Sequence, residues 1–138
     1  MITNPDTCAG CRMCEVACSL HHQGAVDLEK ARLRVDRDPF GGLFQPRVCH
    51  QCSHPFCMVA CPVNAISIRN TDGAVIVDEE TCTACGSCVE ACPFGMIAVD
   101  DTRGAAIKCD LCGGSPQCVQ CCPVSALGVG KFGEGVRK

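Results

Sequence analysis

The sequence predicts an α+β fold in which short helices and β-hairpins surround groups of cysteine side chains, with little aliphatic core. Cysteine supplies 17 of the 138 residues, a share typical of cross-linked or metal-bound scaffolds. The chain has five Phe and no Trp or Tyr, which leaves too few large apolar side chains for a sizeable core. Four cysteine-rich runs alternate with segments that have the two-residue periodicity of strands. The cysteines and what they bind should therefore take the place of the core.

The first cysteine-rich run, Cys8–Cys18, has the spacing C-x2-C-x2-C-x3-C. Ser19, and not proline, follows its last cysteine. We therefore expect a short helix that begins near Cys11 and continues toward His22, because nothing in this segment breaks it. The fourth thiol of the run would then be presented from a helix.

A cysteine-free spacer, residues 23–46, separates the first two runs. Residues 30–36 alternate polar and apolar side chains, and residues 38–42 have the composition of a turn. This pattern predicts a hairpin that covers one group of cysteines. Its charged face is a candidate docking surface, with an ordinary solvated strand face as the alternative.

The second run, Cys49–Pro62, places four residues between its second and third cysteines, which predicts a larger loop. Two short β-prone segments then flank a glycine-containing turn at residues 70–73, so we expect a hairpin over residues 64–78. The third run, Cys82–Pro93, has the spacing C-x2-C-x2-C-x3-C-P. A further hairpin is expected over residues 96–108 by the same argument.

The fourth run, Cys109–Pro123, completes an internal repeat. Three segments align without a gap through their C-x3-C-P motif: residues 57–66, 88–97 and 118–127. In this alignment Cys121 occupies the position of Ala60 and Ala91, so it is the spare cysteine and 16 of the 17 remain as ligands. The glycine-rich tail, residues 128–138, is expected to be mobile.

Disulfides, zinc sites and iron-sulfur clusters are the three uses open to so many cysteines. Disulfides are not expected, because the number of cysteines is odd and residues 1–6 lack the basic and apolar leader that directs a chain to an oxidising compartment. We therefore expect a reducing compartment, the cytoplasm. Zinc sites of four cysteines use two C-x-x-C pairs and need no C-x3-C-P ending. Three closely spaced thiolates with a remote fourth before proline are the pattern of bacterial ferredoxins, whose fourth thiolate reaches a second cluster. We therefore expect four 4Fe-4S clusters, with zinc as the alternative.

Residues beside the cysteines have predicted supporting roles. Small residues at Gly10, Ala84 and Gly86 should let the loops close tightly, with backbone N–H groups directed at cluster sulfur. His50 and His54 are candidates to tune a reduction potential by hydrogen bonding, with solvated or capping roles as the alternative. The remaining pair, His21 and His22, are interpreted as polar residues at a helix end.

Composition also excludes several functions. The formal net charge is −3, and four oxidised clusters with their thiolates would add roughly −8, which does not suit a nucleic-acid partner. No basic stripe with interleaved aromatic residues is present. No apolar run approaches the roughly 20 residues that span a bilayer, so no direct membrane insertion is expected. No Ser/His/Asp set, phosphate loop or carboxylate pair suggests that the chain is itself catalytic.

The four runs resemble those of four-cluster electron-transfer subunits of molybdenum and tungsten pterin oxidoreductases, such as the dimethyl sulfoxide reductase and formate dehydrogenase types. The resemblance extends from Cys8 to Leu127. The segment Cys14–His22 and the short chain are most similar to the small iron-sulfur subunits of aldehyde oxidoreductases. The longer insertions and the extra C-terminal segment of larger family members are absent, so a membrane quinone role is not expected.

The resemblance implies two ferredoxin-like dicluster units: an inner unit over residues 46–100 and an outer unit formed by residues 1–45 and 101–138. It further implies that each cluster takes three cysteines from one run and the fourth from another. The implied sets are Cys8, Cys11, Cys14 and Cys122; Cys109, Cys112, Cys118 and Cys18; Cys82, Cys85, Cys88 and Cys61; and Cys49, Cys52, Cys57 and Cys92.

The same resemblance implies that single electrons pass through the clusters between a catalytic oxidoreductase subunit, of the tungsten or molybdenum pterin class, and a redox partner. That partner would be a soluble carrier such as a ferredoxin, or a further NAD or flavin subunit. Three alternatives stay open: a stand-alone polyferredoxin, a self-associating cluster wire, and a subunit of a hydrogenase or carbon monoxide dehydrogenase.

Overall fold

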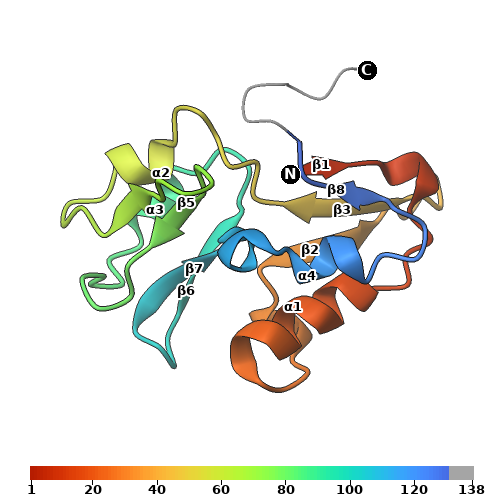
Figure 1. The fold of residues 1–138 in the computed structure, drawn as a ribbon, viewed down its shortest axis with the longest axis horizontal. Helices are drawn as coiled ribbons and strands as arrows, with labels where there is room; N and C mark the ends of the chain where they lie inside the picture. Colours follow the sequence, from red (N-terminus) through yellow and green to blue (C-terminus); the bar gives the residue numbers. More distant parts are fainter. Residues whose placement is uncertain (131–138) are drawn as a thin grey trace.

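Short helices alternate with two-stranded antiparallel hairpins along the whole chain, as in a small mixed helix-and-strand protein (Figure 1). The structure is a computed structural model, and it describes residues 1–130. Within that range every sheet has two strands, so no large sheet supplies a core. This agrees with the α+β expectation of short elements arranged around cysteine groups.

Helix α1, Met13–Gln23, is the longest helix among the described residues, with 11 residues. It begins after Arg12, whose φ of 59° turns the chain into the first helical turn. It ends at Gly24, where φ is 71° and the backbone N–H donates to the carbonyl oxygen of Leu20 at 2.9 Å. The predicted helix in the first run is confirmed.

No helix in residues 1–130 has the length and apolar character to cross a bilayer.

The other helices are single turns inside or beside the cysteine runs. Three are α-helical: α2 (Phe56–Val59), α3 (Ser87–Glu90) and α4 (Gln117–Gln120). Three are 3-10 turns: η1 (Pro5–Thr7), η2 (Leu28–Lys30) and η3 (Leu111–Gly114). Each single-turn α-helix precedes the last cysteine of its run, as the repeat predicts.

All three predicted hairpins are confirmed. The spacer forms β2 (Leu33–Arg37) and β3 (Phe44–Val48). The next hairpin joins β4 (Ile66–Ile68) to β5 (Val75–Val77), and the last joins β6 (Ile97–Asp100) to β7 (Ala105–Lys108).

A fourth strand pair was not predicted. Strand β1, Ile2–Thr3, pairs with β8, Leu127–Gly128, so the start of the chain lies against the segment after the fourth run (Figure 1). Strands of two residues carry no readable periodicity, which is why the sequence did not predict this pair. The expectation of a mobile tail from residue 128 is wrong for Gly128, and its part at 131–138 lies outside the described residues.

Two separate groups of buried residues form the interior, and cysteines contribute to both. The first group includes Leu33 of the spacer hairpin and Leu111 of the fourth run. The second is built from Ile66, Val75 and Ile97 of the two later hairpins. Each group is small, in agreement with the prediction of little aliphatic core.

Polar side chains join the two parts of the molecule. Lys30 Nζ pairs with the buried carboxylate of Asp100 at 2.5 Å, and Arg103 contacts both Glu79 and the carbonyl oxygen of His22.

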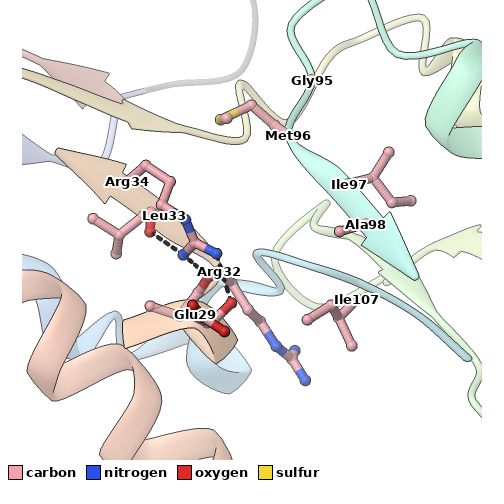
Figure 2. Close-up of a pocket in the computed structure, with 10 residues that line it drawn as sticks. Glu29, Arg32, Leu33, Arg34, Gly95, Met96, Ile97, Ala98 and Ile107 are labelled. Carbon is pink, nitrogen blue, oxygen red and sulfur yellow. Dashed lines mark hydrogen bonds between the residues drawn. The ribbon is translucent and has the colours of Figure 1, made fainter. Parts of the chain in front are cut away.

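A pocket of about 90 Å³ lies between η2 and β2 on one side and β6 and β7 on the other, lined by residues such as Arg34 (Figure 2). It contains no cysteine, so it is not a candidate metal site.

Candidate metal centre

All 17 cysteines lie within the described residues and are free thiols. Cysteines from different runs approach one another, and no pair forms a disulfide. This donor set fits 4Fe-4S clusters, which are held by Cys thiolates.

The second run and Cys92 of the third run line one cavity. The four thiols there are those predicted to act together: Cys49, Cys52, Cys57 and Cys92. The remaining walls are mainly apolar and include Val75 and Ile97. Burial raises the pKa of Cys57 and of Cys52, and the neighbouring thiols of Cys49 and Cys92 add to the rise.

The first run and Cys122 line a second cavity. Its four thiols are Cys8, Cys11, Cys14 and Cys122. Val35 and Pro46 of the spacer hairpin form part of its wall, so the hairpin covers a cysteine group as predicted. Burial raises the pKa of Cys14 to about 12. A metal that binds here must therefore displace a firmly held proton.

Cys18 leaves the first run and joins the thiols of the fourth run. Burial raises its pKa to about 11, and the thiols of Cys112 and Cys109 contribute to that rise. The pKa of Cys118 is raised in the same way by burial and by the thiols of Cys109, Cys18 and Cys112. These four thiols, which were predicted to act together, therefore lie close to one another.

The third run meets Cys61 of the second. Burial raises the pKa of Cys88, and the thiols of Cys82, Cys57 and Cys61 add to the effect. Cys85, the remaining member of this predicted set, is exposed, and Ser87 Oγ lies 3.4 Å from its Sγ. The hydrogen bond from Ser87 lowers the pKa of Cys85, in contrast to the buried thiols.

Left-handed backbone recurs at equivalent positions of the runs. In every run, the residue directly before the second cysteine has a positive φ. These residues are Gly10 (66°), Gln51 (53°), Ala84 (54°) and Leu111 (59°). At Gly10 a side chain would also collide with the ring of Phe44, so glycine is required there. Gly86, the third small residue named from the sequence, has φ 81°.

A second recurring feature follows the last cysteine of each C-x3-C-P motif. Three residues after that cysteine the chain has positive φ, at Asn64 (54°), Gly95 (61°) and Ser125 (51°). The next backbone N–H turns back and donates to the cysteine Sγ, in the pairs Ala65–Cys61 (3.2 Å), Met96–Cys92 (3.4 Å) and Ala126–Cys122 (3.2 Å). Cys18, which has no following proline, instead accepts from Arg32 of the spacer at 3.2 Å. All four sulfurs thus receive a backbone hydrogen bond.

Electrostatic effects between thiols of neighbouring sets indicate that the four sets lie in a row. Cys57 contributes to the raised pKa of Cys88, which links the set of the third run to that of the second. Cys49 does the same for Cys109, and Cys14 for Cys118. The resulting order of runs is third, second, fourth, first.

Several polar residues beside the thiols were missed from the sequence. Glu15, Gln51 and Lys108 are almost fully buried, at 0%, 2% and 3% exposed. Lys108 ends strand β7 and Glu15 and Gln51 lie inside cysteine runs, and a charged or polar residue at such a position carries no sequence signal of burial. Spatial neighbours from other runs are what bury these side chains.

Of the four histidines, His22 differs most from its predicted role. The ring of His22 lies against Cys112, with Nε2 at 3.8 Å from Sγ and at 3.5 Å from Asp110 Oδ1, so it is more than a polar residue at a helix end. His50 packs against Phe94, with ring centroids 4.2 Å apart, and lines the cavity of the second run. His54 is exposed and contacts Ser53. His21 is exposed in the last turn of α1, as expected.

Cys121 lies outside both of the cysteine-lined cavities. Its Sγ donates to the carbonyl oxygens of Met13 at 3.5 Å and of Cys118 at 3.6 Å. A thiol that bonds to backbone carbonyls behaves as a small packing residue.

Comparison with known families gives two matches. Residues 40–132 match the family described as "4Fe-4S dicluster domain", and residues 5–24 match a "4Fe-4S binding domain". Together these matches include all four cysteine runs.

Curated relatives share most of the chain. The polyferredoxin-like subunit of aliphatic sulfonate oxidoreductase from Pyrococcus furiosus is 46% identical over 122 residues, covering 88% of this chain and 70% of the relative. A tetrathionate reductase subunit from Archaeoglobus fulgidus is 36% identical, covering 80% of this chain and 53% of the relative. The beta subunit of NADH-dependent phenylglyoxylate dehydrogenase from Aromatoleum evansii is 33% identical, but the chain spans 28% of its length.

A solved structure has a similar fold. A chain of the active site complex BamBC of benzoyl coenzyme A reductase, in complex with zinc, is 26% identical with a TM-score of 0.51. The match covers 92% of this chain and 74% of that chain. With its cysteine runs, its thiol sets and these matches, the chain belongs to the 4Fe-4S dicluster domain family.

Proposed function

We propose that this chain is an electron-transfer subunit that relays single electrons through four 4Fe-4S clusters. The observation that carries the proposal is that cysteines from four separate runs approach one another in four sets. In addition, a thiol of each set affects the pKa of a thiol in the neighbouring set. A bound cluster supplies the one-electron chemistry, while burial, charge and hydrogen bonds to sulfur adjust its potential.

The proposed ligands are three thiolates from one run and one from another for each cluster. The sets are Cys8, Cys11, Cys14 and Cys122; Cys109, Cys112, Cys118 and Cys18; Cys82, Cys85, Cys88 and Cys61; and Cys49, Cys52, Cys57 and Cys92. The two cysteine-lined cavities support two of these sets directly, and the mutual effects of the thiols on their pKa values support the others except for Cys85, which is assigned by its spacing in the third run. Cys121 is left as a packing residue.

Two dicluster units follow from this assignment. Residues 46–100 would hold the inner pair of clusters, and residues 1–45 with 101–138 the outer pair. The two groups of buried residues support this division in part: the first contains cysteines of the first and fourth runs together with Cys49, and the second contains Cys88 with Cys57 and Cys61 packed against it. Electrons would then pass along the row of thiol sets, from one unit to the other.

The proposed partner is a catalytic oxidoreductase subunit of the tungsten or molybdenum pterin class in the cytoplasm. The relatives that are subunits of a sulfonate oxidoreductase and of a tetrathionate reductase support an oxidoreductase partner. A ferredoxin, or an NAD or flavin subunit, would exchange electrons at the other end of the row. The exposed tip of the spacer hairpin, where Phe40 is 98% exposed, is a candidate contact surface.

Metal analysis tests the number of clusters. Protein purified without oxygen should contain about sixteen iron and sixteen sulfide per chain, because four clusters of four iron atoms are proposed. A count near eight, or zinc in place of iron, would contradict the four-cluster assignment.

Two further measurements test the role. The isolated chain should accept and donate electrons without turning over a substrate, and turnover by the chain alone would show that it is itself catalytic. Affinity purification of the tagged chain from its own cells should recover a catalytic oxidoreductase subunit in fixed stoichiometry. Recovery of long homopolymers alone would favour the self-associating wire.

A further inference from the structure

Lys108 places a buried amino group between two of the cysteine sets. It is the last residue of β7 and directly precedes Cys109 of the fourth run. Its side chain also lines the cavity that contains the thiols of the second run and Cys92. The residue as a whole is 3% exposed, so water cannot solvate its charge.

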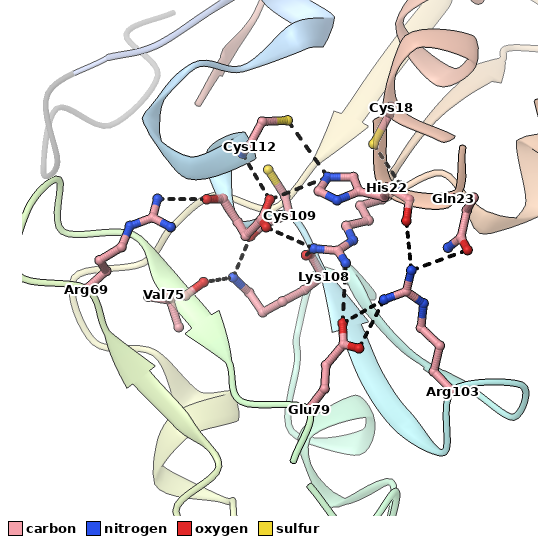
Figure 3. Close-up of polar contacts among 12 residues, drawn as sticks. Cys18, His22, Gln23, Arg69, Val75, Glu79, Arg103, Lys108, Cys109 and Cys112 are labelled. Carbon is pink, nitrogen blue, oxygen red and sulfur yellow. Dashed lines mark hydrogen bonds and ion pairs between the residues drawn. The ribbon is translucent and has the colours of Figure 1, made fainter. Parts of the chain in front are cut away.

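The Lys108 ammonium group is held by carbonyl oxygens. Nζ donates to the carbonyl oxygen of Cys109 at 2.8 Å and to that of Val75 (Figure 3). Among residues 1–130 no acidic side chain forms an ion pair with it, whereas the nearby Arg32 pairs with Asp110 at 3.1 Å. A lysine ammonium has three protons to donate, and the two carbonyls use two of them.

The thiols on both sides respond to this charge. Burial raises the pKa of Cys57 and Cys52 in the second run, and the positive charge of Lys108 opposes that rise. The same opposition acts on Cys109 in the fourth run. The geometry places Lys108 between the same two sets: it lines the cavity that holds the thiols of the second run, it bonds to the carbonyl oxygen of Cys109, and Cys49 and Cys109 belong to one buried group.

A buried charge without a counter-ion is costly, and it persists where surrounding groups of opposite sign compensate it. Within the described part of the chain, the groups that can do so beside Lys108 are the carbonyl oxygens and the thiolates of the two sets. The negative charge of a cluster with its thiolates would complete the compensation. This reasoning rests on the proposed function, because it requires a cluster in each set.

We propose that the fixed positive charge of the buried Lys108 ammonium group raises the reduction potentials of the two middle clusters of the row. A reduced cluster carries one more negative charge than an oxidised one, so a nearby fixed cation stabilises the reduced form. The effect should fall on the clusters of Cys49, Cys52, Cys57 and Cys92, and of Cys109, Cys112, Cys118 and Cys18. The end sets do not include a thiol whose pKa responds to Lys108 or a residue that bonds to it, so the two end clusters should respond less, because the interaction of charges weakens with distance.

A purely structural role is the competing interpretation. Lys108 and Gln51 both bond to backbone groups of Val75 and Cys109, so either side chain could act only as a clamp. Gln51 makes the same type of contact without a charge. It therefore provides the matched control.

The test is a redox titration, monitored by electron paramagnetic resonance, of the full chain loaded with clusters. In Lys108→Met, which keeps an unbranched side chain one atom shorter and removes the charge, two of the four midpoint potentials should fall. The expected change is at least tenfold in each reduction equilibrium constant, about 59 mV for one electron. Lys108→Arg should keep the midpoint potentials close to those of the wild type. Gln51→Leu should change each reduction equilibrium constant by less than tenfold. Cys57→Ser and Cys112→Ser mark which signals belong to the two middle clusters.

Four outcomes of the redox titration would overturn the proposal. These are unchanged potentials in Lys108→Met, equal shifts of all four, a matching shift in Gln51→Leu, and no recovery in Lys108→Arg. If Lys108→Met loses iron, Lys108→Gln is titrated in its place. Loss of iron from both, with retention in Lys108→Arg, would assign Lys108 a structural role and also overturn the proposal. A wild-type iron count far from sixteen would instead reject the proposed function, so the two failures are distinguishable.

Discussion

Gln51 and Lys108 donate hydrogen bonds to the same acceptor, the carbonyl oxygen of Cys109, at 2.7 and 2.8 Å. The side-chain oxygen of Gln51 also accepts from the backbone N–H of Val75 at 2.8 Å. The loop of the second run, the β4–β5 hairpin and the start of the fourth run are therefore fastened together by two buried side chains. Chain segments far apart in sequence meet at this point.

Gln51→Leu should destabilise the protein. The substitution leaves the buried N–H of Val75 without its acceptor, which costs about 1–3 kcal/mol in the free energy of unfolding. Denaturant-induced unfolding of the cluster-loaded protein measures the loss. Gln45→Leu, on an exposed strand position, is the control and should change stability little. Equal stability of the two variants would contradict a fastening role for Gln51.

Cys121→Ser and Cys122→Ser should behave differently although the residues are adjacent. Cys121 bonds only to backbone carbonyls and lies outside both cysteine-lined cavities, so its serine variant should retain full iron content. Cys122 lines the cavity of the first run, so its serine variant should lose or alter one cluster. Iron and sulfide analysis of both variants checks this. Loss of iron from Cys121→Ser would overturn the alignment of the repeat.

The left-handed turn after Cys61 predicts a backbone effect at an exposed residue. Asn64 has a φ of 54°, a conformation that costs an ordinary L-residue about 1–2 kcal/mol and a β-branched residue more. Asn64→Val should therefore weaken the turn that directs the N–H of Ala65 at Cys61, and iron should be released faster on mild heating. Asn64→Gly relieves the backbone and should release iron no faster than the wild type. Identical release from both variants would show that the turn is not needed.

The Lys30–Asp100 ion pair predicts a pH dependence. Hydrogen bonds from Lys30 and Thr102 hold the pKa of Asp100 well below its usual range. A carboxyl group with a lowered folded pKa stabilises the protein above its unfolded pKa, about 3.9, and loses that effect as the pH falls toward the folded pKa. The difference in unfolding free energy between the wild type and Asp100→Asn should be constant from about pH 8 to pH 5 and shrink below about pH 4.

Denaturant unfolding at a series of pH values checks this expectation. Lys30→Met is the partner variant, and the double variant should be less destabilised than the sum of the two single changes, because both remove the same contact. Arg103 Nε lies 4.0 Å from Asp100 Oδ2 and supplies the only other nearby cation for this carboxylate in residues 1–130. Full additivity of the two changes would show that the pair is not coupled.

The local elements could be predicted from the sequence because their signals are local. The hairpin between β4 and β5 follows from alternation and a glycine turn, and α1 follows from the absence of proline after Cys18. The proposed ferredoxin-like exchange of the fourth cysteine is inferred from spacing together with a family resemblance.

Burial of polar groups could not be predicted in the same way. His22 was interpreted only as a polar residue at a helix end, yet Asp110 and Cys112 of the fourth run lie against it. Lys108 is the last residue of strand β7, next to a cysteine run, yet residues from the second run enclose it. These environments are created by contacts between runs about 60 to 90 positions apart, which no local pattern records.

Helix α1 places Cys14 and Cys18 one helical turn apart, and the two thiols serve different cysteine sets. The rise of an α-helix fixes their separation along its axis at about 6 Å, whatever the surrounding loops do. In the proposed row, the hydrogen-bonded backbone of helix α1 thus fixes the spacing between the cluster of the first run and the cluster of the fourth run. Among the steps of the relay, this one should be the least sensitive to temperature and to thermal motion of the loops.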